Sequence, residues 1–351
     1  MPLDYFHGRW HFHQRMNKKI SNNLERLSAL IAQNPSKAEI LDALHPWRTS
    51  PQLKYNNTFV ILQFAVGLLL FLIGFFCLFK FGGWSILLIL GGLGLCAFAY
   101  FSFETKSEID LVIGQLSSQV FQDQYQVKLN QFPTIDKGLI NNTYLLMRIR
   151  QGFDCLNEGN FSNSIESIAS TEWEVDGHLY PVLLFHYKFV DESIVRDPKN
   201  QTQRKKVTSH RWGACVFDMP ALAFVVNGTE TNYPRYPRRW TPSDIQFNQK
   251  YKIKGQQEFE LAKNLTPPRI LALGRSLDAL RGTIMFHEEM NAFCYLSQQN
   301  IFSTQAPAKP ITDISMLRGY LRTLRAPHYE KVKTHLSDII TQFSDKKFFK
   351  T

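Results

Sequence analysis

The fold is decided by two apolar segments, TFVILQFAVGLLLFLIGFFCLF at residues 58–79 and WSILLILGGLGLCAFAYFSF at residues 84–103. The first contains one strongly polar residue, Gln63, and the second contains no charged residue. Each has the length of about 20 residues that an α-helix needs to cross roughly 30 Å of hydrocarbon. Residues 80–83 leave room only for a tight turn, so we expect a helical hairpin that crosses a bilayer twice.

Two buried helices of a large soluble protein are the alternative interpretation. Core helices of soluble proteins rarely continue past about 15 residues without a polar side, and two in succession are rarer still. A cleaved signal peptide fits poorly, because the first segment begins only near residue 58. The membrane hairpin is therefore the interpretation that we adopt.

Glycines indicate that the two helices pack closely. Gly67 and Gly74 are seven residues apart and share one face of the first helix, and Gly91, Gly92 and Gly94 lie in the second. Helices in lipid associate through close contact at such small residues. The alternative is that glycine is simply common in membrane spans, in which case these residues need make no contact.

Basic residues predict the orientation of the hairpin. Arg48 and Lys54 precede the first span and Lys106 follows the second, whereas the turn contains only Lys80. Cytoplasmic flanks of membrane spans are enriched in Lys and Arg, so we expect both termini in the cytoplasm. Any soluble domain would then lie on that same side.

The composition limits the remaining possibilities. The chain has 351 residues and a formal net charge of +10, which suits a domain beside an anionic membrane surface. Nucleic acid would also suit this charge, but no basic tract is interleaved with aromatic residues, so we expect no nucleic-acid partner. The five cysteines lack C-x-x-C spacing, which indicates a reducing cytoplasm, without disulfides or a structural zinc site.

The pattern of apolar residues predicts an α+β protein with an antiparallel sheet and flanking helices. We expect a cytoplasmic helical segment at residues 1–57, the hairpin at 58–103, and a cytoplasmic domain at 104–351 that ends in helices. Helices are expected near residues 20–31, after Ser36, at 109–120, at 140–156, after Pro268, and at 314–324 and 329–343. Strands are expected at 182–190, 207–217, 222–226, 250–254, 283–287 and 292–296. Residues 191–206 are expected to form an exposed loop, residues 231–241 an irregular one, and the helix at 109–120 a direct continuation of the second span.

Several short motifs in the second half of the chain resemble a known family. They are HRWG at 210–213, WTPSDIQF at 240–247, Tyr251-x-Ile253, Glu260-x-Ala262, LTP at 265–267, the apolar hairpin at 283–296 and NIF at 300–302. This pattern is similar to the core of a family of uncharacterised bacterial proteins, in which two membrane spans precede a cytoplasmic α+β domain of unknown function. The resemblance covers residues 55–325 and implies a bacterial inner (plasma) membrane protein. It implies no reaction, because the family supplies no catalytic residues.

Familiar catalytic motifs are absent from the sequence. It contains no G-x-S-x-G, no Walker loop, no H-E-x-x-H and no G-x-G-x-x-G before a helix. His7, His11 and His13 lie close together, but no cysteine or carboxylate completes a familiar set of metal ligands. We therefore predict no catalytic residue, cofactor or metal site.

The candidate functional residues are basic and lie in or beside two expected loops. They are Arg204, Lys205, Lys206, Arg211, Arg235, Arg238 and Arg239. Such residues could contact anionic lipid or an acidic protein partner, although an ordinary solvated surface has the same composition.

The sequence thus predicts a two-pass membrane protein whose cytoplasmic domain is a docking or scaffolding module. A membrane-tethered enzyme of unfamiliar type is the alternative. A pore is disfavoured, because the spans carry no charge and one hairpin lines a path only if it oligomerises.

Overall fold

The computed structural model describes residues 17–45, 47, 51–81, 83–134, 142–196 and 202–344. The chain divides into two compact units. Unit 1 comprises Met1–Val120 and Ala306–Leu324, and unit 2 comprises Phe121–Gln305 and Arg325–Thr351. Residues 306–324 therefore group with the hairpin and not with the sheet.

Unit 1 is helical. Its helices are α1 (Lys18–Ala32), α2 (Lys37–Ala43), α3 (Thr58–Phe81), α4 (Gly83–Ser102), α5 (Ser107–Tyr125) and α10 (Ile314–Arg322). The last turn of α5 belongs to unit 2. The capping box at the start of α2 is confirmed: the Ser36 hydroxyl accepts a hydrogen bond from the Glu39 backbone, and the Glu39 carboxylate accepts one from the Ser36 backbone.

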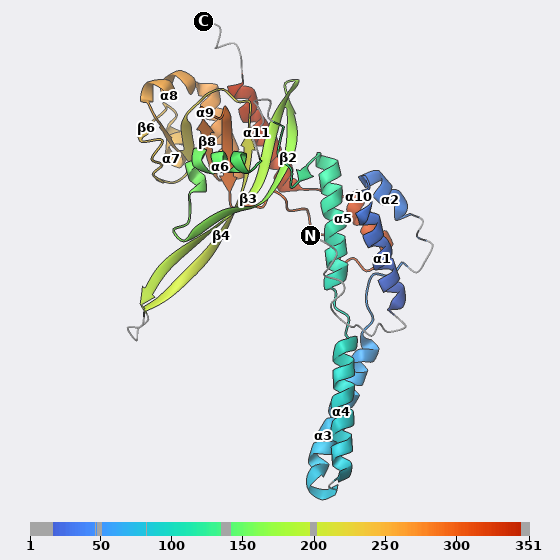
Figure 1. Ribbon diagram of the computed structural model, residues 1–351. Coiled ribbons are helices and arrows are strands. Elements are labelled where there is room, and N and C mark those ends of the chain that lie inside the picture. Colours follow the sequence, from blue (N-terminus) through green and yellow to red (C-terminus); the bar gives the residue numbers. More distant parts are fainter. Residues whose placement is uncertain are drawn as a thin grey trace. The chain divides into compact units, whose positions relative to one another are not determined.

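Helices α3 and α4 form the expected hairpin (Figure 1), and their backbones approach each other closely at Gly67, Gly74 and Gly92. A Cβ atom on Gly92 would lie 2.6 Å from the Gly67 carbonyl oxygen, and one on Gly74 would lie 2.9 Å from the Ile89 nitrogen. Added Cβ atoms on Gly91 and Gly94 would meet nothing within 4 Å. The close approach of the two backbones therefore requires glycine at positions 67, 74 and 92 but not at positions 91 and 94.

The outer surfaces of α3 and α4 are apolar. Phe76 is 75% exposed and Leu87 is 61% exposed, and other large apolar side chains along both helices are similarly open. Both helices are long and apolar enough to cross a membrane. Gly82 and the side chains of Lys80 and Trp84 lie outside the described residues.

The chain leaves the hairpin through a short break, and not through a continuous stalk as the sequence suggested. Helix α4 ends at Ser102, and α5 begins only at Ser107. Between them, the Glu104 carbonyl accepts a hydrogen bond of 2.8 Å from the Asn57 side chain, and the Glu104 carboxylate accepts one from Asn17. These contacts join the two ends of the hairpin, and the non-helical backbone at residues 103–106 is what allows them.

Unit 2 is built on a nine-stranded antiparallel sheet with the order β1-β2-β3-β4-β9-β8-β5-β7-β6. The strands are β1 (Lys128–Leu129), β2 (Ser162–Val175), β3 (His178–Arg196), β4 (Thr202–Val216), β5 (Phe224–Asn227), β6 (Arg238–Trp240), β7 (Lys252–Gly255), β8 (Thr283–His287) and β9 (Ala292–Ser297). Its helices are α6 (Asn142–Gly152), the 3-10 turn η2 (Asp154–Leu156), α7 (Ile245–Lys250), α8 (Glu258–Asn264), α9 (Pro267–Leu280) and α11 (Pro327–Phe343).

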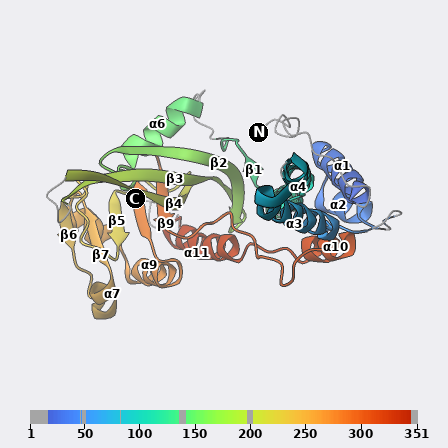
Figure 2. The same cartoon turned by 90° about the horizontal axis from the view of Figure 1, so that it is seen from below.

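Helices cover both faces of this sheet. Figure 2 shows α6 on one face and α9 and α11 on the other. On the α6 face, Phe185 and Tyr187 of β3 pack with Phe153 in one buried cluster. On the opposite face, the ring of Phe286 stacks on that of Phe224 at 4.5 Å between centroids and also contacts Phe343 of α11.

Two sequence expectations about this sheet are wrong. Residues 191–206 are not a loop, because β3 and β4 continue as a paired ribbon to Arg196 and Thr202. Their polar residues pair across the ribbon, for example Glu192 opposite Lys206, so no apolar pattern marked them as strand. Strand β2 was missed, because its alternation is interrupted by a bulge between Ile165 and Ser167.

The glycine contacts give a first prediction. Replacement of Gly92 by Leu should destabilise the hairpin by about 1–3 kcal/mol, because the new side chain meets the backbone of α3. Gly91→Leu is the matched control and should have little effect. The melting temperature of the detergent-solubilised chain measures both, and equal effects of the two substitutions would contradict the packing described.

Candidate functional site

The seven basic residues suggested by the sequence do not form one patch. Arg204, Lys205, Lys206 and Arg211 lie on β4, Arg238 and Arg239 on β6, and Arg235 just before β6. Strands β9, β8, β5 and β7 separate β4 from β6 in the sheet. The two groups must therefore be considered separately.

Arg235 makes hydrogen bonds to other residues of unit 2. Its Nη2 donates to the Gln151 carbonyl at 3.2 Å, its Nη1 donates to Nε2 of His287, and its backbone N–H donates to the Asp154 carboxylate. Burial, and then the Arg235 charge, lower the pKa of His287. Arg235 thus anchors the loop before β6 to the end of α6 and to β8.

Arg211 and Arg239 each have an acidic neighbour. Arg211 lies 3.7 Å from the Glu158 carboxylate and over the ring of Phe189, and Arg239 lies 3.6 Å from Glu230. Burial raises the pKa of Glu158, although Arg211 opposes that shift.

Arg204, Lys205 and Lys206 belong to a projecting ribbon, which we call the β3–β4 arm and define as residues 191–196 and 202–211 (Figure 1). The Arg204 side chain is 74% exposed and lies 4.0 Å from Glu192, and Lys206 lies 3.9 Å from the same carboxylate. Exposed ion pairs of this length contribute little free energy, although Lys206 also lies 3.4 Å from the centre of the Phe161 ring.

One edge of the arm presents backbone groups without a strand partner in the part of the chain that the structure describes. Pairing of β4 with β9 begins only at Trp212. The Phe217 N–H donates to the Pro181 carbonyl, and hydrogen-bonded pairs alternate along an antiparallel ladder. Odd-numbered residues of β4 therefore bond to β3, and the even-numbered ones direct their N–H and C=O groups outward: Arg204, Lys206, Thr208 and His210.

A side chain covers the β3 edge of the same arm at one position. The Asn160 side chain accepts a hydrogen bond of 2.7 Å from the Glu192 N–H and donates one of 3.0 Å to the Glu192 carbonyl. This amide replaces a neighbouring strand, which is a common protection for a sheet edge. On the β4 edge, the described contact is weaker: the Arg211 side chain donates to the His210 carbonyl at 3.4 Å.

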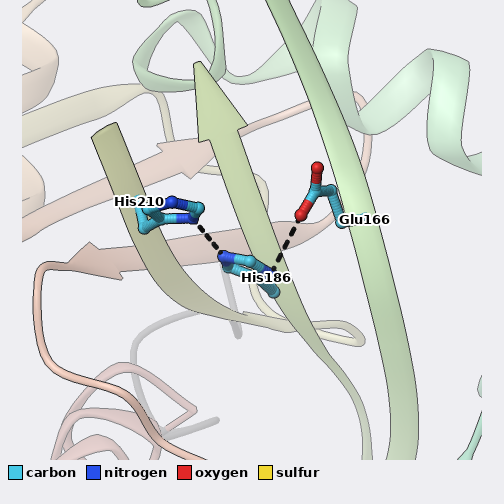
Figure 3. Close-up of side chains that lie close together, drawn as sticks. All are labelled: Glu166, His186 and His210. Atoms are coloured by element: carbon cyan, nitrogen blue, oxygen red, sulfur yellow. Dashed lines mark hydrogen bonds and ion pairs between the residues drawn. The ribbon is translucent and has the colours of Figure 1, made fainter. Parts of the chain in front are cut away.

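A second arrangement lies near the base of the arm, where three adjacent strands bring Glu166, His186 and His210 together (Figure 3). Nε2 of His186 lies 2.9 Å from Nδ1 of His210, and Nδ1 of His186 lies 3.7 Å from the Glu166 carboxylate. One ligand atom from each residue can be chosen so that all three lie within 4.8 Å of one another. We call these three residues the His–Glu cluster.

Neighbouring side chains fix the His–Glu cluster in place. Lys188 lies 2.7 Å from Oε1 of Glu166 and lowers the pKa of that carboxyl. The ring of Trp212 stacks on His186, with 5.0 Å between centroids and an angle of 14°. Burial, and then His210, lower the pKa of His186.

The sequence alone could not assemble the His–Glu cluster. Its members come from β2, β3 and β4, and His186 lies diagonally from His210, which pairs with Lys188. The bulge puts both Glu166 and Ser167 on the histidine face, whereas Ile165 packs into the α6 cluster. Alternation of apolar residues identifies His186 and His210 as outward-facing, but their proximity depends on strand register.

Glu288, in the β8–β9 turn, accepts a hydrogen bond from Gln256 at 3.2 Å and lines a small open pocket with Gln257 and Glu260. The buried residues Leu222, Phe224 and Leu261 also line this pocket.

No protein-family model, curated protein or solved structure matches this chain. The family resemblance of residues 55–325 therefore gains no support from these comparisons.

One buried and two half-buried histidines give a prediction about pH. The pKa values of His287, His328 and His335 are lowered in the folded chain, first of all by burial. These imidazoles therefore bind protons less readily in the folded chain than in the unfolded chain, which takes up protons below about pH 6.5. Stability should be lost as pH falls through that value toward the lower folded pKa values.

The melting temperature of the detergent-solubilised chain between about pH 7.5 and pH 5.5 tests this. His287→Gln keeps an acceptor for Arg235 and should reduce the dependence on pH. A melting temperature that stays constant or rises on acidification would contradict the prediction.

Proposed function

We propose that this protein is a membrane-anchored docking module, which binds an extended acidic segment of a partner protein along the free edge of β4. The observation that carries the proposal is the β3–β4 arm. It combines outward backbone N–H and C=O groups with Arg204, Lys205 and Lys206 on one strand.

The anchor of the proposed module is the α3–α4 hairpin. Close packing of Gly67 against Gly92 supports an antiparallel pair, whose two outer ends, at Thr58 and Ser102, lie together. All soluble parts of the chain would then share one side of the membrane. Following the basic residues that flank the spans, we assign that side, with both termini, to the cytoplasm of a bacterium whose inner membrane holds the hairpin.

The chemistry of the β4 edge indicates the kind of segment that fits. Successive side chains of a strand point to opposite faces, so Lys205 lies on one face of the arm and Arg204 and Lys206 lie on the other. An added strand would place acidic residues beside these cations on both faces. Val207 of β4 is 46% exposed, so an apolar residue in the added strand would also find a neighbour.

A protein segment fits this edge better than anionic lipid does. Lipid headgroups would satisfy the three cations, but they offer no regular series of N–H and C=O groups. A strand added to the edge satisfies the backbone groups and the cations together. The enzyme alternative has no observation of this kind in its favour.

Binding of a defined probe tests the proposed function. A fluorescent peptide in which glutamate and valine alternate should bind the full-length chain in detergent. Arg204→Glu, Lys205→Glu and Lys206→Glu together should weaken that binding by about tenfold or more, because three attractive contacts become repulsive. Thr208→Pro should also weaken binding, because it removes an outward N–H and leaves the ladder to β3 intact.

The control is the double substitution Arg238→Glu and Arg239→Glu on β6, which changes the net charge but not the arm, and Thr208→Ala controls for the proline. Equal loss of binding in the β6 variant would mean that net charge, and not the position of the cations on the arm, explains the weaker binding. If the arm cations mediate binding to phosphatidylglycerol vesicles and not to the peptide, the docked ligand is lipid and the proposal is overturned.

Reporter fusions test the orientation of the hairpin. A reporter active only in the cytoplasm should be active when fused after residue 344 and inactive when inserted at the α3–α4 turn. A periplasmic reporter should give the reverse pattern. Activity of both fusions on the same side would show that α3 and α4 do not cross the membrane.

A further inference from the structure

We propose that Glu166, His186 and His210 bind one divalent transition-metal cation of the Zn²⁺ type. The site would use one ring nitrogen of each histidine and one oxygen of Glu166. Two imidazoles and one carboxylate are typical ligands of Zn²⁺, Ni²⁺, Cu²⁺ and Fe²⁺, whereas Mg²⁺ and Ca²⁺ prefer oxygen ligands alone.

The ligand atoms already lie close to the positions that a cation needs. In a tetrahedral zinc site, bonds of about 2.0–2.1 Å separate neighbouring ligand atoms by about 3.3 Å. The facing nitrogens of His186 and His210 are 2.9 Å apart, and all three ligand atoms lie within 4.8 Å. His210 faces Nε2 of His186 and Glu166 faces Nδ1 of the same ring, so the exposed Glu166 and His210 side chains must rotate to share one cation with a single His186 nitrogen.

The protonation states also suit metal binding. Imidazole must be neutral to bind a metal. In the structure, the two histidines share one N–H···N hydrogen bond, in which the accepting ring nitrogen carries no hydrogen. When a cation takes the place of that hydrogen bond, the hydrogen of the donating ring moves to the other nitrogen of the same ring, and no net proton is released.

Surrounding groups act as supports for such a site. Lys188 holds Oε1 of Glu166 at 2.7 Å, which leaves Oε2 directed toward His186. Trp212 stacks on His186 and restricts its ring. Glu166 and His210 are exposed, so a fourth ligand can come from water, as in open zinc sites with three protein ligands. Metal ligands in proteins are commonly oriented by outer contacts of this kind.

The metal site shares His210 with the β4 edge, but it uses the imidazole of that residue, whereas the proposed docking uses its backbone groups. The peptide test changes Arg204, Lys205, Lys206 and Thr208, and none of these belongs to the His–Glu cluster. Failure of one proposal therefore leaves the other untouched.

Titration with Zn²⁺ and Co²⁺ tests the metal site. The full-length chain, purified without a histidine tag, should bind one equivalent of Zn²⁺ at micromolar concentration in competition with a chromophoric chelator. Co²⁺ should give visible absorption bands typical of four-coordinate cobalt. His186→Gln, His210→Gln and Glu166→Gln should each weaken Zn²⁺ binding by at least about tenfold and abolish the cobalt bands.

Two controls keep this test specific. Replacement of His178, which is exposed near the turn between β2 and β3, should leave the affinity unchanged. Replacement of His7, His11 and His13, which lie outside the described residues, removes any binding by the N-terminal segment and should leave the cobalt bands intact. Absence of Zn²⁺ binding, or binding that survives His186→Gln and His210→Gln in folded variants, would overturn the proposal.

Discussion

Large apolar side chains cover the outward surfaces of α3 and α4, and such a surface needs to be kept out of water. The contact between the helices cannot provide that cover, because small residues such as Gly67 and Gly92 make it and leave the phenylalanines and leucines outside. Both helices are long and apolar enough to cross a membrane, and we propose lipid as the solvent in which this arrangement is stable. The polar contacts of Asn17 and Asn57 with Glu104 then mark the end of the apolar region, where the backbone leaves the helix.

The β3–β4 arm presents the opposite physical problem, because its unpaired groups are polar. A long unpaired strand edge attracts other strands, and proteins commonly protect such edges with charged side chains or local covers. Here Asn160 covers the β3 edge at Glu192, whereas the β4 edge carries Arg204, Lys205 and Lys206. In the docking that we propose, these positive charges would disfavour pairing with most segments and favour pairing with acidic ones.

Sequence patterns predicted the elements that have a strong periodicity or a strong local signal. The two long apolar helices, the Ser36 capping box, the helix after Pro267 and the β8–β9 hairpin all belong to this group. The arm and β2 were mispredicted, because cross-strand polar pairs and a bulge hide the period of two residues. The basic residues were identified from composition, but their division between β4 and β6 depends on strand order. The His–Glu cluster depends on the register of three strands, which no local pattern contains.

Collision accessibility of nitroxide labels tests most directly whether lipid covers the hairpin. Labels would replace Leu69 and Leu90, which are 58% and 59% exposed, in a chain reconstituted in bilayers with Cys77 and Cys96 replaced by alanine. Our account predicts high accessibility to oxygen and low accessibility to a water-soluble nickel reagent at both positions. High accessibility to the nickel reagent at both positions would place these helices in water and contradict the account.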